Sequence, residues 1–174
     1  MKFIISFSLY LFVGITFGYT QNSDLKVSID ERGRKVAVGL LNEQYLLNDS
    51  SYTWFKKGME AYMPDNDAVA YLQRENKAFS IIVYGGTWCS DTQDLLPKFF
   101  RVVHDADIDS SAIKIYGLDA DKLGIDKVKP QNEIEFVPTF IIMKDGKELG
   151  RIVETARRSI EKDMMYILKQ EGTR

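Results

Sequence analysis

The sequence predicts an α/β domain in which helices flank a central mixed β-sheet. From residue 66 onward, segments with helical spacing of apolar residues alternate with short, β-branched apolar runs. The run 79–84 (FSIIVY) is almost entirely apolar, which is typical of a central strand covered on both faces. Asp145-Gly146 separates two later apolar runs and favours a two-residue hairpin turn, which adds an antiparallel pair. An alternating order that ends in a hairpin is typical of a layered α/β domain.

Length and charge limit what this chain can build and bind. Its 174 residues, 45% hydrophobic and 28% charged, suit one domain with a sizeable core. The 23 Lys and Arg residues nearly balance the 25 Asp and Glu residues, and no block of like charge occurs. We therefore expect neither a nucleic-acid-binding stripe nor an acidic interaction tail.

The first twenty residues differ in composition from the rest of the chain. Lys2 precedes the uncharged apolar segment 3–19, and the polar segment 21–24 follows it. This order is typical of a secretory signal peptide. The apolar segment is somewhat shorter than the roughly 20 residues that a membrane-spanning helix needs. We predict a signal peptide over 1–20 and a periplasmic or secreted protein, with an uncleaved membrane anchor as the alternative.

Residues 21–65 are predicted to form an N-terminal extension before the main domain at 66–174. The extension contains a candidate hairpin, with strands at 26–29 and 35–41 around the turn-like segment 30–33. A helix starting at Ser50 or Ser51 and running through Tyr62 follows it. The further predicted elements are a helix from Asp65 or Asn66 through Arg74, a helix from about Cys89, strands at 113–118, 138–144 and 148–153, and a last helix capped by Ser159.

Cys89 is the only cysteine in the chain. Disulfides persist in the oxidising compartments outside the cytoplasm, but a single thiol cannot form an intramolecular bridge. Cys89 is therefore a small buried hydrophobe, a site of intermolecular pairing or a reactive group. The residues around it must decide between these three roles.

Four sequence features follow one another in a fixed order within residues 66–170. They are Trp88-Cys89 after an apolar strand, Pro97 eight residues beyond the cysteine, Val137-Pro138-Thr139 opening a strand, and Asp145-Gly146 in the next hairpin. In this order they resemble the thioredoxin superfamily. The segment 86–92 (GTWCSDT) is similar to exported bacterial thioredoxin-like proteins with a single-cysteine WCxDT motif. The resemblance implies a thioredoxin-like fold and a cis peptide bond before Pro138.

The motif supplies a thiol together with groups that would stabilise or destabilise its thiolate form. A thiol attacks a disulfide only as the thiolate, and free cysteine is mostly protonated at neutral pH. At the first turn of a helix, Cys89 would face unpaired backbone N–H groups and the positive end of the helix dipole. The Thr92 hydroxyl would stand over the same turn and donate to the thiolate. A carboxylate at Asp91 would instead raise the pKa of the thiol, and the sequence does not show whether it or the stabilising groups have the larger effect.

Two parts of a dithiol reductase are absent from the motif. The second thiol of two-cysteine relatives would fall on Thr92, and a hydroxyl cannot resolve a mixed disulfide. The buried acid of thioredoxins would fall on Val83. The resemblance therefore implies monothiol exchange or isomerisation on protein or peptide disulfides, in which an external reducing thiol or the client's own second cysteine releases Cys89.

Two functions stay open at this stage. In the first, a monothiol oxidoreductase or isomerase contributes to redox homeostasis outside the cytoplasm, with Cys89 and Thr92 in the chemistry and Val137, Pro138 and Thr139 docking the client. In the second, the same groove serves a non-catalytic thioredoxin-like module that binds protein partners. The motif residues Trp88, Ser90 and Asp91 fit either function. The sequence holds no Cys and His cluster for zinc, so we expect no metal and no cofactor.

Overall fold

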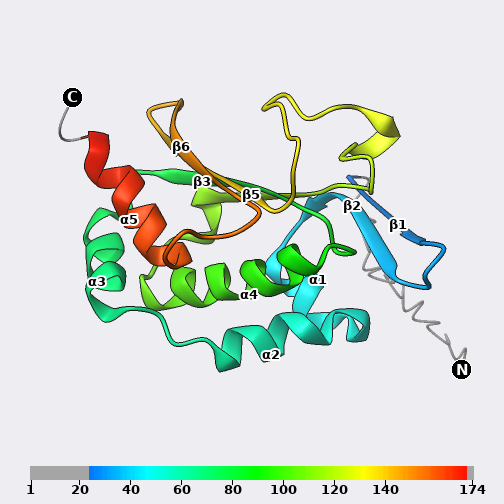
Figure 1. The fold of residues 1–174 in the computed structure, drawn as a ribbon, viewed down its shortest axis with the longest axis horizontal. Helices are drawn as coiled ribbons and strands as arrows, with labels where there is room; N and C mark the ends of the chain where they lie inside the picture. The colour runs from blue at the N-terminus through cyan, green and yellow to red at the C-terminus, as the bar shows by residue number, and fades with distance from the viewer. Residues whose placement is uncertain (1–23, 172–174) are drawn as a thin grey trace, which may run out of the picture.

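The computed structural model describes residues 24–171, so the predicted signal peptide at 1–20 lies outside the described residues. A six-stranded mixed sheet runs through the domain in the order β1-β2-β4-β3-β5-β6 (Figure 1). β3 and β4 pair in parallel, and the other neighbouring strands pair antiparallel. The strands are β1 (Leu25–Ile29), β2 (Lys35–Leu41), β3 (Ser80–Gly85), β4 (Ile113–Gly117), β5 (Thr139–Lys144) and β6 (Lys147–Val153). The predicted α/β class with a central mixed sheet flanked by helices is confirmed.

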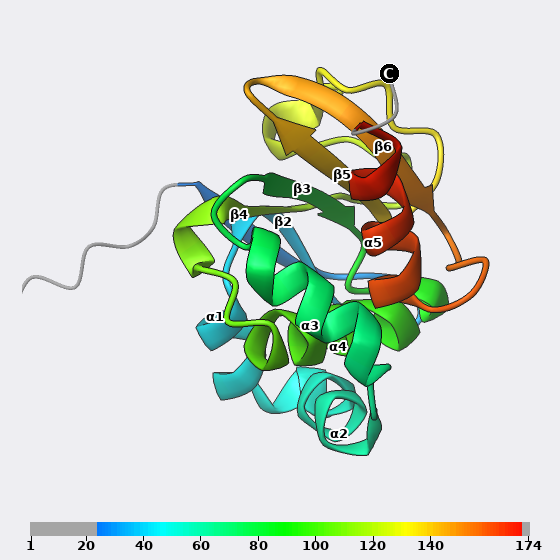
Figure 2. The same ribbon diagram turned by 90° about the vertical axis from the view of Figure 1, so that its left-hand side faces the viewer.

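The helices gather beneath one face of this sheet (Figures 1 and 2). Short polar side chains begin several of them: the Asp65 carboxylate, for example, accepts from the backbone N–H of Ala68 at 3.0 Å. The helices are α1 (Glu43–Asn48), α2 (Thr53–Ala61), α3 (Asn66–Glu75), α4 (Ser90–Asp105) and α5 (Ile160–Glu171), with 3-10 turns η1 (Ser50–Tyr52), η2 (Ser110–Ala112) and η3 (Ile125–Lys127). No described helix has the length and apolarity that a membrane span requires.

The predicted hairpin of the extension is present and belongs to the same sheet. β2 pairs with β4, placing Gly39 opposite Gly117. The strands approach so closely here that a Cβ on Gly117 would lie 2.2 Å from the Ala37 carbonyl oxygen. Glycine at 117 therefore permits the pairing, because any side chain would collide with backbone. Through this pairing the extension becomes the far edge of the sheet.

The main core lies between the sheet and the helices. Phe99 and Phe100 of α4 contact the ring of Phe140 from β5 and the ring of Phe55 from α2, respectively. α2 also packs closely along α4, where a Cβ on Gly58 would lie 2.6 Å from Cγ of Pro97. α4 is therefore buried between the sheet and α2, and its N-terminus has a fixed position.

The opposite face of the sheet carries a smaller apolar cluster. Its buried members come from β3, β5 and the chain after β4, and Trp88 and Cys89 pack partly against it. The segment 118–138 crosses this face (Figure 1). The buried members are Tyr84, Leu118, Val137 and Ile141. The thiol loop thus lies at the end of the sheet, where this face meets the start of α4.

Candidate functional site around Cys89

Cys89 occupies the N-cap of α4, with φ −88° and ψ 129°. Its carbonyl accepts the first helical hydrogen bond from the Gln93 N–H at 3.0 Å, and its own N–H donates to the Gly86 carbonyl at 2.9 Å. The side chain is partly buried and makes no capping hydrogen bond. The thiol therefore lies where the first N–H groups of a four-turn helix are unpaired by the helix, an environment that favours an anion.

The peptide before Pro138 lies directly against the thiol. Cys89 Sγ is 3.3 Å from the Val137 carbonyl oxygen, which accepts its hydrogen bond. The Val137–Pro138 bond is cis. Val137, Pro138 and Thr139 are all buried, and the Thr139 hydroxyl donates to the Phe136 carbonyl at 2.7 Å. The fold thus joins the two motifs that the sequence singled out, although they are 48 residues apart.

Thr92 lies on the first turn of α4 with its side chain buried. Its hydroxyl oxygen accepts from the Gly86 N–H at 3.2 Å, and its methyl group fills the space beside Gly85, where a Cβ would lie 3.0 Å from that methyl carbon. The structure therefore gives Thr92 a role in holding the turn that leads into α4. Its hydrogen bond to a Cys89 thiolate stays a prediction.

The other polar residues of the motif face outward. Ser90 is exposed. Asp91 is half-buried and lines a small cavity of about 240 Å³ together with Lys98 and Glu154. The Lys98 ammonium in this cavity forms a salt bridge with the Asp94 carboxylate at 2.7 Å.

Trp88 is anchored rather than free on the surface. Its indole N–H donates to the Leu118 carbonyl at 2.9 Å, and its ring covers Gly86, where a Cβ would lie 2.6 Å from the indole. The residue stays partly accessible beside Cys89. Gly86 therefore has to be glycine for the tryptophan to lie flat across the turn.

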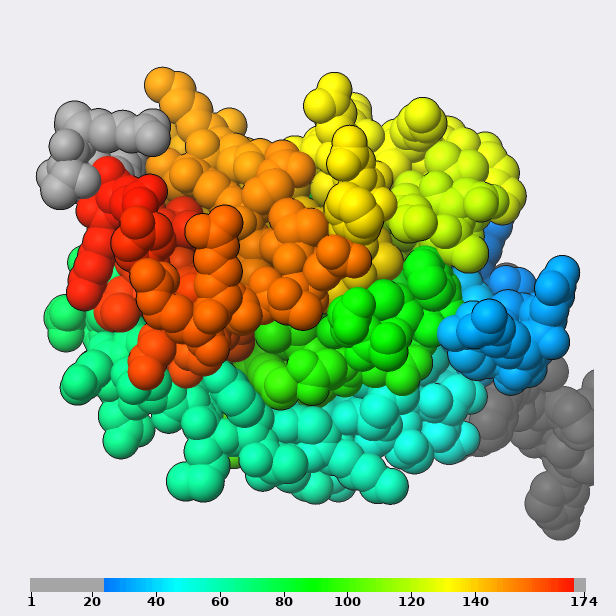
Figure 3. Space-filling view, viewed as in Figure 1, coloured from blue at the N-terminus to red at the C-terminus, as the bar shows by residue number. Residues whose placement is uncertain are grey.

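Sequence reasoning missed the contacts that fix the thiol loop to the N-terminal hairpin. The Thr87 hydroxyl donates to the Lys35 carbonyl at 3.0 Å and accepts from the Ala37 N–H at 3.1 Å. Arg34 donates to the Trp88 carbonyl. In the space-filling view the hairpin lies against the start of α4 (Figure 3). Polar side chains next to the motif were the available signal, but their partners depend on the sheet pairing of the extension.

Phe136 is a further neighbour that the motif did not indicate. It directly precedes Val137 and is 48% exposed. An accessible aromatic ring one residue from the thiol's carbonyl partner is suited to contact the apolar part of a bound peptide. The sequence signal was its position before the proline motif.

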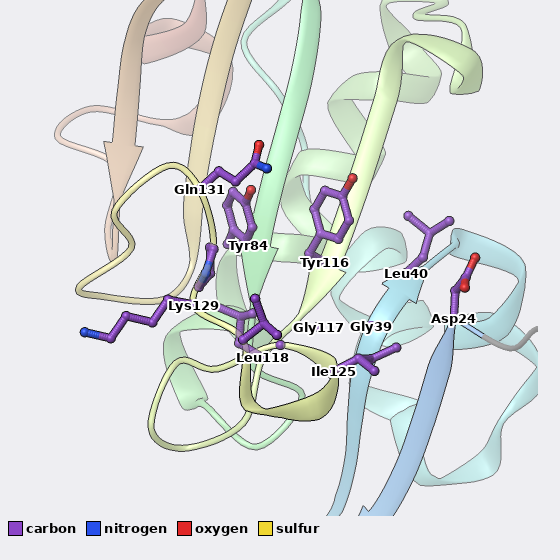
Figure 4. Close-up of a pocket in the computed structure, with 13 residues that line it drawn as sticks. Asp24, Gly39, Leu40, Tyr84, Tyr116, Gly117, Leu118, Ile125, Lys129 and Gln131 are labelled. Atoms are coloured by element: carbon purple, nitrogen blue, oxygen red, sulfur yellow. The ribbon is translucent and has the colours of Figure 1, made fainter.

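A separate open pocket of about 480 Å³ lies on the sheet face that carries the smaller cluster (Figure 4). Its floor includes the stacked rings of Tyr84 and Tyr116, 5.3 Å apart between centroids, and its rim includes Lys129. Burial raises the pKa of Tyr84, whose hydroxyl donates to the Asn132 side chain at 2.8 Å. Cys89 does not line this pocket. The thiol therefore lies outside this pocket, where the partly accessible Cys89 contacts the buried Val137.

Within residues 24–171, no three His, Cys, Asp or Glu side chains cluster in a way that could hold a metal ion. His104 lies instead in the last turn of α4, and its Nε2 is 2.8 Å from a Glu43 carboxylate oxygen. This pair links the end of α4 to α1.

Several known proteins are similar to this chain. Residues 65–165 match the thioredoxin family model. A thioredoxin-like protein of Acanthamoeba polyphaga mimivirus is 27% identical over 110 residues, which are 63% of this chain and 77% of that protein. Thioredoxin H2-2 of Oryza sativa subsp. japonica is 30% identical over 104 residues, which are 60% of this chain and 72% of that protein. A solved Pseudomonas aeruginosa protein of unknown function aligns with a TM-score of 0.47 at 17% identity, covering 76% of this chain and 87% of that one.

The sheet order, the thiol at the start of α4 and the cis proline facing it define a thioredoxin-like domain. The family model spans more than half of the sequence, and the chain belongs to the thioredoxin family. Membership places its chemistry in thiol–disulfide redox reactions in general, with protein thiols and disulfides as the class of substrate.

Proposed function

We propose that this protein is an extracytoplasmic monothiol member of the family that exchanges or isomerises disulfides of client proteins through Cys89. One observation carries the proposal: the only thiol of the chain belongs to the N-cap residue of α4, is partly accessible and lies 3.3 Å from the Val137 carbonyl oxygen. A client held against residues 137–139 would present its disulfide to that sulfur. The N-terminal sequence supports export, because segment 3–19 has the profile of a signal peptide.

The reaction needs two exchange steps. The Cys89 thiolate attacks one sulfur of the client disulfide; a Cys89–client disulfide forms, the client S–S bond breaks and the second client sulfur leaves as a thiolate. A client thiolate then attacks the mixed disulfide and releases Cys89 as a thiolate. If the sulfur that left attacks, the original client disulfide forms again. If another client cysteine attacks, a new client disulfide forms, which is isomerisation. Neither outcome changes the net oxidation state of the client. Net reduction requires two external thiol groups, from one dithiol or from two monothiols, that become oxidised to a disulfide.

Thr92 explains why this chain does not supply the thiol for the second step. A buried hydroxyl stands three residues after Cys89, and it accepts a hydrogen bond from Gly86. A hydroxyl cannot displace a thiolate from a disulfide at neutral pH, so the thiolate that resolves the mixed disulfide comes from the client itself or from an external thiol. The protein is therefore suited to isomerisation, in which the client carries the resolving thiol.

The test is recovery of activity by a ribonuclease with scrambled disulfides in a glutathione buffer. We expect the protein to accelerate recovery, and to form a client adduct detectable by mass when the buffer thiol is omitted. Cys89→Ser should abolish both effects, whereas Ser90→Ala, a change on the exposed neighbour, should preserve them. Equal recovery with and without the wild-type protein would contradict the proposal and favour the non-catalytic binding module.

A further inference from the structure

We propose that Arg34, in the turn of the N-terminal hairpin, is a positioning residue that holds the Trp88–Cys89 peptide in the conformation from which Cys89 reacts. The inference deepens the proposed function and rests on it. Arg34 lies outside residues 65–165, the part of the chain that the family model matches. The extension thereby contributes to the thiol site itself.

The contact is direct and spans 54 residues of sequence. Nη1 of Arg34 donates to the Trp88 carbonyl oxygen at 2.6 Å. The same peptide unit carries the N–H of Cys89, which donates to the Gly86 carbonyl at 2.9 Å. Both polar atoms of the peptide that precedes the thiol are thus hydrogen-bonded. Because the direction of the Cys89 side chain depends on the plane of that peptide, fixing the peptide orients the sulfur.

Arg34 is itself held in place from the other side. Its Nε and Nη2 each lie 2.7 Å from Oδ2 of Asp30, and its backbone N–H donates to Oδ1 of Asp30 at 2.8 Å. The hydrogen bond from the Arg34 N–H lowers the pKa of Asp30, which keeps the carboxylate charged. One guanidinium therefore joins the hairpin turn to the thiol loop. A lysine ammonium lacks this planar fork and cannot reproduce both contacts in the same geometry.

The hairpin supports the same loop at a second point, through the Thr87 hydroxyl bonded to Lys35 and Ala37 of β2. Arg34 adds something that Thr87 does not, a positive charge at the carbonyl one residue before Cys89. A nearby positive charge favours the anionic form of a thiol, and the Asp30 carboxylate paired with the same guanidinium offsets part of this effect. Loss of Arg34 should therefore slow the reaction of Cys89 and also move its pH profile towards higher pH.

The test compares Arg34→Met with Arg32→Met, which removes the same charge from an exposed residue of the same turn. We would measure the rate of Cys89 alkylation from pH 5 to 9 and the rate of adduct formation with a disulfide-bearing peptide. For Arg34→Met we expect both rates at pH 7 to fall about tenfold, the factor that corresponds to roughly 1.4 kcal/mol. The alkylation profile should shift towards higher pH. Arg32→Met should match the wild type in both measurements.

Arg34→Lys guards against a variant that fails to fold, because it keeps the charge while losing the fork. We expect a smaller shift in its pH profile and a clear loss of rate. The positioning role would be overturned if both Arg34 variants matched Arg32→Met in alkylation rate and pH profile. This holds even if their unfolding temperatures are lower. A wild-type protein that captures no disulfide would instead overturn the proposed function, while the role of Arg34 would still be decided by the alkylation rates.

Discussion

Thr87→Val tests whether the extension is built into the thiol site. The substitution keeps the shape of the side chain but removes the hydroxyl that donates to Lys35 and accepts from Ala37. Thr87 is 3% exposed and its hydrogen bond with the Ala37 N–H is buried, so water does not replace the hydroxyl as the partner of that N–H. A buried polar group left without its partner costs about 1–3 kcal/mol. The buried Ala37 N–H accounts for most of the loss and the part-buried bond to Lys35 adds less, so the protein should be destabilised by about 2–3 kcal/mol.

The assay is unfolding by heat and by urea, each followed by the fluorescence of the tryptophans, one of which, Trp88, is next to the mutated residue. For a domain of this size, each 1 kcal/mol corresponds to about 2–4 °C, so the unfolding temperature should fall by roughly 4–12 °C. Thr87→Ser retains the hydroxyl and is the matched control, with most of the stability expected to return. If Thr87→Val unfolds at the same denaturant concentration as Thr87→Ser, the hydroxyl does not join the hairpin to the loop, and the reasoning is refuted.

Three further outcomes follow from the packing, charges and exposed surface of the protein. Gly58→Ala should lower the unfolding free energy measurably in urea, because its Cβ would lie 2.6 Å from the rigid ring of Pro97; unchanged stability would show that α2 and α4 separate easily. The Lys35 ammonium lowers the pKa of Asp49, so this pair's contribution to stability is complete above the unfolded-state value of about 3.9 and is lost as pH falls through the folded-state value. Asp49→Asn should therefore flatten the acid side of the stability profile, and an identical profile would contradict this. Phe136→Ala should weaken adduct formation with an apolar disulfide peptide more than with glutathione disulfide, and equal losses would exclude a peptide contact at this 48% exposed ring.

Local pattern alone predicted most elements of the fold. The apolar run at 79–84 became β3, one residue later than expected, and the hairpin turn at Asp145-Gly146 joins β5 to β6. Of the two residues expected to start the helix through Arg74, Asp65 and Asn66, it is Asp65 that caps it. These features succeeded because apolar periodicity, turn geometry and capping act over a few residues. The short helix α1 was not predicted, since six residues beginning after Asn42 carry too little periodicity to detect.

The candidate site was predictable only in part, because some of its contacts depend on how distant strands pair. The motif around Cys89 and the proline at 138 were visible in the sequence, and the fold brings Cys89 Sγ to 3.3 Å from the carbonyl oxygen before that proline. The contacts of Arg34 and Thr87 were not visible, because they depend on β2 pairing antiparallel with β4 across more than seventy residues. Periodicity reports which face of a strand is buried, but it does not report which strand will be its neighbour.

The central claim is that the fold prepares Cys89 as a nucleophile, and its alkylation rate is the most direct measurement. Because the chain has a single cysteine, the rate of thiol modification reports on this residue alone. The comparison is between the folded protein and the same protein in denaturant, across pH 5 to 9, with free cysteine correcting for the effect of the denaturant. The account predicts that below pH 7 the folded protein reacts faster than the unfolded one. A folded protein that reacts more slowly at every pH would contradict it, since burial against Val137 would then outweigh the helix terminus and Arg34.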